Sequence, residues 1–199
     1  MKQVSFIRIL FILCVSFVLL NFSGCIENND EESETTDVDL GLVKLQIDEL
    51  VESEFEKLPN PNEHVTDPYV VSEGKLFAGL KVKEKIELNF VKSPDFVIQQ
   101  SAELYSTEKA EEFVEHLKET DSFPGTLNDW NFTTVPIKLI GTNSVLKQNV
   151  SMLEGEETTI TMLVFRVDHI VSIVVGSVPK EDIITYGNII EGKINEQLV

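Results

Sequence analysis

An alternation of apolar and polar residues runs through the middle of the sequence. From Leu76 to Phe90 the even-numbered positions are apolar except for Glu84. Successive side chains of a β-strand point to opposite faces, so this pattern predicts strand structure, either one long strand or two strands joined near residues 83–85. A chain with such long strands has to pair them in a sheet, and this requirement limits the fold more than any other feature.

Further strands are predicted later in the sequence. Their expected ranges are 96–105, 132–140, 145–153, 158–166 and 170–176. Short segments separate the last four of these ranges, and the turn at residues 167–169 is the shortest of them. Short turns between consecutive strands indicate antiparallel pairing, because parallel pairing needs a long crossover.

Two segments have helical periodicity. Ser106 is a good N-cap for a helix whose apolar residues share one face, namely Ala110, Phe113, Val114 and Leu117. Pro179 suits the first turn of a closing helix, whose apolar stripe is Ile183, Ile190, Ile194 and Leu198. The segment 43–47 fits either a first strand or, with Leu40 and Leu50, a helical stripe. Residues 58–68 contain three prolines and predict a loop.

These elements predict a single α+β domain over residues 40–199. The sheet is expected to be mostly antiparallel, with two or three packed helices. About 160 residues are enough to bury a hydrophobic core without disulfides or metals.

The N-terminus has the layout of a cleavable export signal. Lys2 and Arg8 precede an apolar run over residues 9–20, and Ser23 and Gly24 stand before Cys25. The stretch resembles the lipobox of prokaryotic lipoproteins, which implies a signal peptide over residues 1–24 and a lipid on Cys25. The alternative is an uncleaved signal anchor, in which Cys14 and Cys25 are ordinary apolar residues.

Cysteine usage excludes several chemistries in the folded domain. Cys14 lies in the expected signal and Cys25 is the expected lipidation site, and the sequence has no other cysteine. A disulfide, a cysteine nucleophile and a thiolate metal site are therefore not expected in residues 40–199.

An acidic segment follows Cys25. Between Glu27 and Asp39 the sequence has seven acids and no base, so residues 25–39 are expected to form a disordered tether. Loss of Lys2 and Arg8 with the signal changes the formal net charge from −18 to about −20. Binding to nucleic acid depends on lysine and arginine, so no nucleic-acid partner is expected. The expected location is the extracytoplasmic face of the membrane.

Candidate metal ligands are few. The predicted loop offers oxygen donors for a hard cation such as Ca²⁺, namely Asn60, Asn62, Glu63 and Asp67, but without the spacing of an EF-hand. His64, His116 and His169 do not have the spacing of a known histidine motif. No metal and no cofactor is predicted.

Other residues suggest binding or modification. Arg166 is the only arginine after the signal, and a structural ion pair is the preferred interpretation over anion recognition. Trp130, near Phe123 and Phe132, forms either an aromatic binding patch or part of the core or its rim. Asn131 and Asn149 begin Asn-x-Ser/Thr sequons and are possible glycosylation sites.

No coherent catalytic set is present. Ser106 and Lys109 match the Ser-x-x-Lys pattern of serine acyl enzymes, as do Ser144 and Lys147, but a matching Lys-Thr-Gly segment is missing. An N-capping role accounts for Ser106. The protein is therefore not expected to be an enzyme.

Several segments together resemble a known group of proteins. The succession IQQSAELYSTEKAEEF, VPIKLIGTNS and ITMLVFRVDHIVSIVV, followed by an amphipathic helix, is similar to small archaeal surface lipoproteins with a PsbP/Mog1-like α/β sandwich. The resemblance implies an accessory or binding module without an established activity. The expected function is thus a lipid-anchored, non-catalytic protein that binds an envelope partner; the alternative is a lipoprotein that binds a small ligand or a divalent cation.

Overall fold

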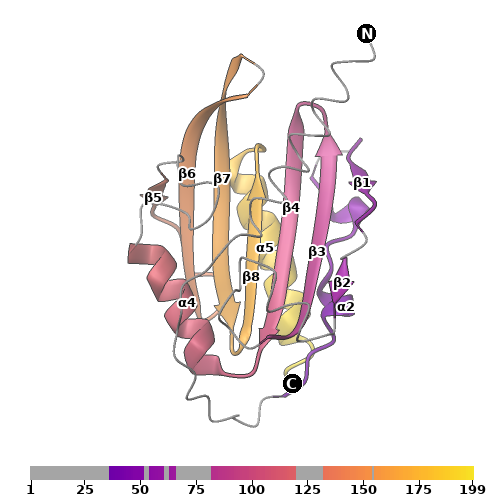
Figure 1. Cartoon of the computed structure of the whole chain (residues 1–199), viewed down its shortest axis with the longest axis vertical. Helices are drawn as coiled ribbons and strands as arrows, with labels where there is room; N and C mark the ends of the chain where they lie inside the picture. The colour runs from indigo at the N-terminus through magenta and orange to yellow at the C-terminus, as the bar shows by residue number, and fades with distance from the viewer. Residues whose placement is uncertain (1–35, 52–53, 61–62, 66–81, 120–131, 154) are drawn as a thin grey trace.

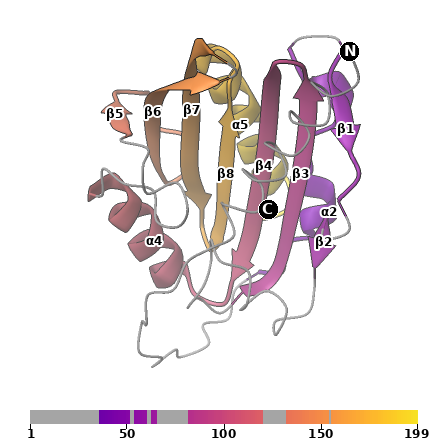
Figure 2. The ribbon, with the colours of Figure 1, turned by 45° about the horizontal axis from the view of Figure 1, so that its top comes forward.

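One antiparallel sheet with helices on both faces forms the folded domain (Figures 1 and 2). The computed structural model describes residues 36–51, 54–60, 63–65, 82–119, 132–153 and 155–199. The strands are β1 (Glu56–Leu58), β2 (His64–Val65), β3 (Val82–Lys92), β4 (Asp95–Leu104), β5 (Thr133–Val135), β6 (Asn143–Leu153), β7 (Glu156–Val167) and β8 (Ile170–Gly176). The helices are α2 (Leu40–Val43), α4 (Thr107–Glu119) and α5 (Lys180–Asn195), with a 3₁₀ turn η1 (Ile47–Glu49). The predicted α+β class and the mostly antiparallel sheet are confirmed.

The strand order across the sheet is β1-β3-β4-β8-β7-β6-β5, and β2 also pairs with β3. Two-residue turns join β3 to β4 and β7 to β8, as the antiparallel registers Lys92↔Asp95 and Val167↔Ile170 show, and β6 pairs with β7 as far as Leu153↔Glu156. The sequence predicted β4, β6, β7 and β8 to within about two residues, which is the ordinary uncertainty of element boundaries.

Each face of the sheet has its own hydrophobic core. The core under α4 contains Ile98, Val114 and Val164, and the core under α5 contains Leu88, Phe165 and Ile190. Alternate residues of the central strands supply the two cores, so these strands are buried on both faces. Figures 1 and 2 show α4 and α5 on opposite faces of the sheet.

The N-terminal segment lies along α5. Asp39 caps α2 and also donates its backbone N–H to Gln197, while the backbone N–H of Val51 bonds to the Tyr186 hydroxyl. The strand prediction for residues 43–47 was wrong, and the helical alternative is confirmed only in part: α2 ends at Val43, η1 begins at Ile47, and residues 44–46 are in neither a helix nor a strand. Packing on α5, which local periodicity does not encode, decides the conformation of this segment. Val38 is buried, so the ordered domain extends into the predicted tether, and residues 25–35 lie outside the described residues.

Other boundaries differ from the prediction. The expected strand 132–140 is reduced to β5, and the expected loop 58–68 contains β2 and the end of β1. Of the expected strand 76–90, residues 76–81 lie outside the described residues. Ser106 caps α4 as expected, accepting the Lys109 backbone N–H at 3.3 Å, whereas Pro179 is the N-cap of α5 rather than part of its first turn.

Close packing between α5 and β7 depends on Gly187. A Cβ at this position would lie 2.3 Å from Leu163 Cδ2, whereas a Cβ at Gly192 would meet nothing within 4 Å. Glycine inside a helix costs about 1 kcal/mol relative to alanine, so Gly187 is explained by the close approach of the helix to the sheet.

We expect the two glycines of α5 to respond oppositely to alanine. Gly187→Ala should lower the free energy of unfolding by a net ~1–2 kcal/mol, because overpacking outweighs the gain in helix propensity. Gly192→Ala, the matched control in the same helix, should raise it by up to about 1 kcal/mol. Urea denaturation of both variants measures the difference, and a gain from Gly187→Ala would show that α5 does not pack so closely on β7.

Candidate functional site

The loop that offers candidate cation ligands uses its described side chains within the fold. The carboxylate of Glu63 forms ion pairs with Lys44 at 3.0 Å and with Lys57 at 2.8 Å. The hydrogen bond from Lys57 is the largest cause of a lowered pKa at Glu63. Asn60 instead donates to Glu87, and Asn62 and Asp67 lie outside the described residues. Within the described residues, no group of three or more His, Cys, Asp or Glu is arranged to hold a metal.

Arg166 forms a structural ion pair, as the sequence favoured. Its Nη2 lies 2.7 Å from Glu111 of α4, and its Nη1 donates to the Asp168 carbonyl. Only 7% of the Arg166 side chain is exposed, and its buried Nε has no hydrogen-bond partner. The arginine therefore ties the end of β7 to α4.

The other candidates from the sequence are dispersed. Trp130, Phe123 and Asn131 lie outside the described residues, whereas Phe132 is buried in the core under α4. Asn149 is half-buried on β6, opposite Ile160. These positions give no evidence for an aromatic patch or a glycan.

The two Ser-x-x-Lys matches do not form Ser–Lys pairs. Lys109 Nζ binds Glu112 at 2.9 Å, while Ser106 caps α4. Ser144 and Lys147 are three residues apart on β6, and strand alternation places them on opposite faces.

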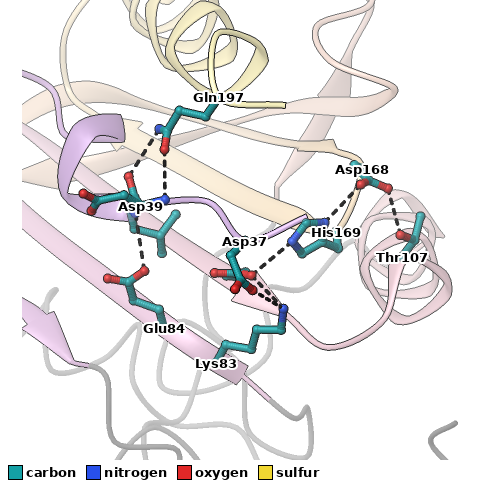
Figure 3. A network of polar contacts seen from close by, with 10 residues as sticks. Asp37, Asp39, Lys83, Glu84, Thr107, Asp168, His169 and Gln197 are labelled. Atoms are coloured by element: carbon teal, nitrogen blue, oxygen red, sulfur yellow. Dashed lines mark hydrogen bonds and ion pairs between the residues drawn. The ribbon is translucent and has the colours of Figure 1, made fainter. Parts of the chain in front are cut away.

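A network of polar side chains closes one end of the sheet (Figure 3). His169 is fully buried; its Nε2 lies 3.2 Å from Glu103 and its Nδ1 lies 3.1 Å from Asp168. Lys83 contacts both Glu103 and Asp37 at 3.0 Å. The network joins β3, β4 and the β7–β8 turn to the N-terminal segment. Both ring nitrogens of His169 can donate to the two carboxylates when the ring is doubly protonated.

Electrostatics favour the charged forms of two members of this network. Burial opposes ionisation of Asp168, but hydrogen bonds from Thr107 and His169 outweigh it and lower the pKa of Asp168. Burial likewise opposes the charge of Lys83, but hydrogen bonds to Glu103 and Asp37 raise its pKa. The sequence indicated only the turn geometry of Asp168 and His169, and their partners Glu103 and Lys83 were missed because they come from distant strands.

A second polar cluster lies on the α4-side face of β3 and β4. Lys85, Glu87 and Asn89 alternate with apolar residues along β3 and are buried, with relative exposures of 6%, 4% and 6%. Gln100 stands opposite Glu87 in the register and donates its Nε2 to Glu87 at 2.9 Å. We call Lys85, Glu87, Asn89 and Gln100 the polar row.

Two features of the polar row are typical of functional sites. Burial lowers the pKa of Lys85 and raises the pKa of Glu87, in each case against the attraction between the two. The Oε1 atom of Gln100 is buried without a hydrogen-bond partner, which costs free energy in a structure whose buried polar atoms are mostly paired. The sequence pattern missed this row, because alternation alone assigns polar residues to a solvated face.

Glu87→Gln is expected to change the pH dependence of stability. Burial raises the folded-state pKa of Glu87 above 4.5. Its contribution to the free energy of unfolding is therefore fully present below pH 4.5 and is lost as the pH rises through the folded-state pKa. The variant should therefore gain stability relative to the natural chain as pH rises from about 4 to about 7, measured by urea denaturation.

Glu115 provides the control with the opposite sign. The hydrogen bond from Lys118 is the largest cause of the lowered pKa of Glu115. The contribution of Glu115 to the free energy of unfolding is therefore present above pH 4.5 and is lost as the pH falls. Glu115→Gln should lose stability relative to the natural chain as pH rises. If the stability of both variants relative to the natural chain changed with pH in the same direction, the burial of Glu87 would be contradicted.

Among the described residues, large exposed apolar side chains occur on two segments, at Leu139 and at the C-terminal Val199. Leu42, Ile47 and Val51 lie on the segment that packs along α5. Val150 and Met152 lie on β6, in the hairpin that β6 forms with β7 at the end of the sheet remote from the His169 network (Figure 1). We call residues 149–160 the hairpin arm.

Within the described residues, no helix is both long and apolar enough to cross a membrane.

Comparison with known proteins does not identify a family for the chain. No family model, curated protein or solved structure matches the chain.

Proposed function

We propose that the chain is a lipid-anchored, non-catalytic binding module on the extracytoplasmic face of the membrane. The small residues Ser23 and Gly24 before Cys25 support the anchor, and the acidic residues after Cys25 support a tether. The PsbP/Mog1-like identity of the sandwich belongs to the same proposal, because it rests on the resemblance of short motifs. Fold-level likeness would in any case not define an activity.

The observation that carries this proposal is the position of Asp37 and Asp39, which end the expected tether, relative to the hairpin arm. Asp37 and Asp39 are held at one end of the sheet by Lys83 and Gln197. The hairpin arm extends from the other end (Figure 1). The eleven residues of β6 span roughly 35 Å at about 3.3 Å per residue, so the arm is presented far from the tether.

Cross-linking in intact cells tests the proposed function. The tagged full chain is cross-linked, solubilised and captured, and both bait and bound proteins are identified by mass spectrometry. We expect a reproducible envelope protein together with lipid on Cys25. Recovery of the lipidated chain alone would overturn partner binding, and turnover of a substrate abolished by a point mutation would overturn the non-catalytic assignment.

The polar row supports a second candidate function, the binding of a small ligand. Among the described residues, none donates to Gln100 Oε1 and none accepts a hydrogen bond from Lys85 Nζ. A neutral or zwitterionic ligand with adjacent donors and acceptors would suit these atoms, whereas Lys85 disfavours a divalent cation. A panel of amino acids and carboxamides, with Ca²⁺ as the comparison, tests this by thermal shift, since a ligand at a hundredfold its Kd adds about 2.7 kcal/mol. No shift with any compound would end this candidate.

A further inference from the structure

We propose that the outer edge of β6, over residues 150–153, takes up an extended, basic segment of the envelope partner as an added β-strand. This inference rests on the proposed function and assigns its binding surface. It also specifies the chemistry of the partner, a strand-forming stretch in which apolar side chains alternate with lysine or arginine.

The backbone of β6 provides the first argument. β5 pairs with β6 only from Leu146 to Gln148, and residues 150–153 have no strand partner on the outer side within the described part of the chain. The opposite edge of the sheet is better covered, since β1 and β2 both pair with β3. Unpaired N–H and C=O groups at a sheet edge are a template for an extended chain, which excludes a helix as the occupant.

Side chains provide the second argument. Val150 and Met152 are 60% and 64% exposed, and they share one face of β6. Natural sheet edges are usually protected by lysine, proline or inward-pointing charge, and residues 149–153 contain none of these. An unprotected apolar edge at the exposed end of the sheet is suited to binding alternate apolar side chains of an added strand.

Charge selects the partner. The described residues of the hairpin arm, 149–153 and 155–160, include Glu156 and Glu157 and no lysine or arginine. A second copy of the chain would bring the same two acids to the same edge, and like charges across an interface oppose association. A basic segment of a different protein would instead be attracted to the arm.

Site-specific photo-cross-linking tests the location. In the full chain, expressed in its own cells, the photo-cross-linker p-benzoylphenylalanine replaces Met152. In a control variant it replaces Leu139, which is 61% exposed and lies outside the hairpin arm. We expect an adduct at position 152 but not at 139, with the cross-link mapped to an extended basic segment of another protein. An adduct with a second copy, an adduct in an acidic or helical segment, or equal yields at both positions would overturn the proposal.

Lysine substitutions separate this proposal from the proposed function. Val150→Lys and Met152→Lys add a protective charge that also repels a basic strand, so partner capture should fall at least about tenfold, with Leu139→Lys unaffected. Thermal unfolding confirms that the variants fold. Full capture by both arm variants would overturn the β6 site while the proposed function stands, whereas no partner with the natural chain would overturn both.

Discussion

His169→Leu is expected to lower the free energy of unfolding by about 3 kcal/mol, because it removes a buried hydrogen-bond partner of both Glu103 and Asp168. His169 is fully buried, and only 5% of the Glu103 side chain is exposed, so the variant leaves a carboxylate in the interior that still contacts Lys83 but has lost its histidine partner. The loss follows from the missing hydrogen bonds of the buried carboxylate, which Lys83 alone does not replace. Chemical denaturation at neutral pH measures it.

The double variant distinguishes this explanation from a simple loss of packing. With Glu103→Leu added to His169→Leu, the buried carboxylate is gone and Lys83 still reaches Asp37, so most of the stability should return. His116→Leu, on the exposed surface of α4, should change stability by no more than about 0.5 kcal/mol. A double variant less stable than either single variant would show that the network stabilises the fold through its geometry.

The sequence predicted those elements whose side-chain pattern is local. Ile170–Gly176 was predicted with its observed bounds, and Ser106 with its capping role, because apolar periodicity and N-cap chemistry act over a few residues. The segment 43–47 was ambiguous by the same criteria. Its structure depends on α5, which follows more than a hundred residues later, and a local pattern does not contain that contact.

The candidate sites were harder to predict than the fold. Lys85 and Glu87 occupy the polar positions of an alternating strand, so the pattern assigned them to solvent, yet both are buried. Glu103 reaches His169 only because β4 pairs with β8, and this pairing places Glu103 opposite Ile170. Such clusters arise from strand register, which a single sequence does not specify. Arg166 was predicted correctly as an ion pair, although its partner Glu111 was not.

Cys25→Ser is expected to release the protein from the membrane. A lipidated cysteine would anchor the protein by burying acyl chains in the bilayer, and each buried CH₂ group contributes about 0.8 kcal/mol. Stable attachment needs more than one acyl chain. Without this thiol the attachment chemistry is lost, so the variant should appear in the soluble fraction or remain as an unprocessed precursor. Fractionation with an alkaline wash, followed by intact-mass analysis, measures both outcomes.

Cys14 supplies the matched control, because it lies in the apolar run of the expected signal and would be removed with it. Cys14→Ser should leave both the membrane attachment and the mature mass unchanged. If Cys25→Ser instead stayed in the membrane at the same mass as the natural chain, residues 9–20 would act as an uncleaved anchor. The tether would then begin at a membrane span, and the hairpin arm would still be carried by a domain whose N-terminal segment is fixed to the opposite end of the sheet by Lys83 and Gln197. The surface proposed for β6 therefore depends on the sheet and on export of the domain, whereas the lipid determines only how the domain is attached.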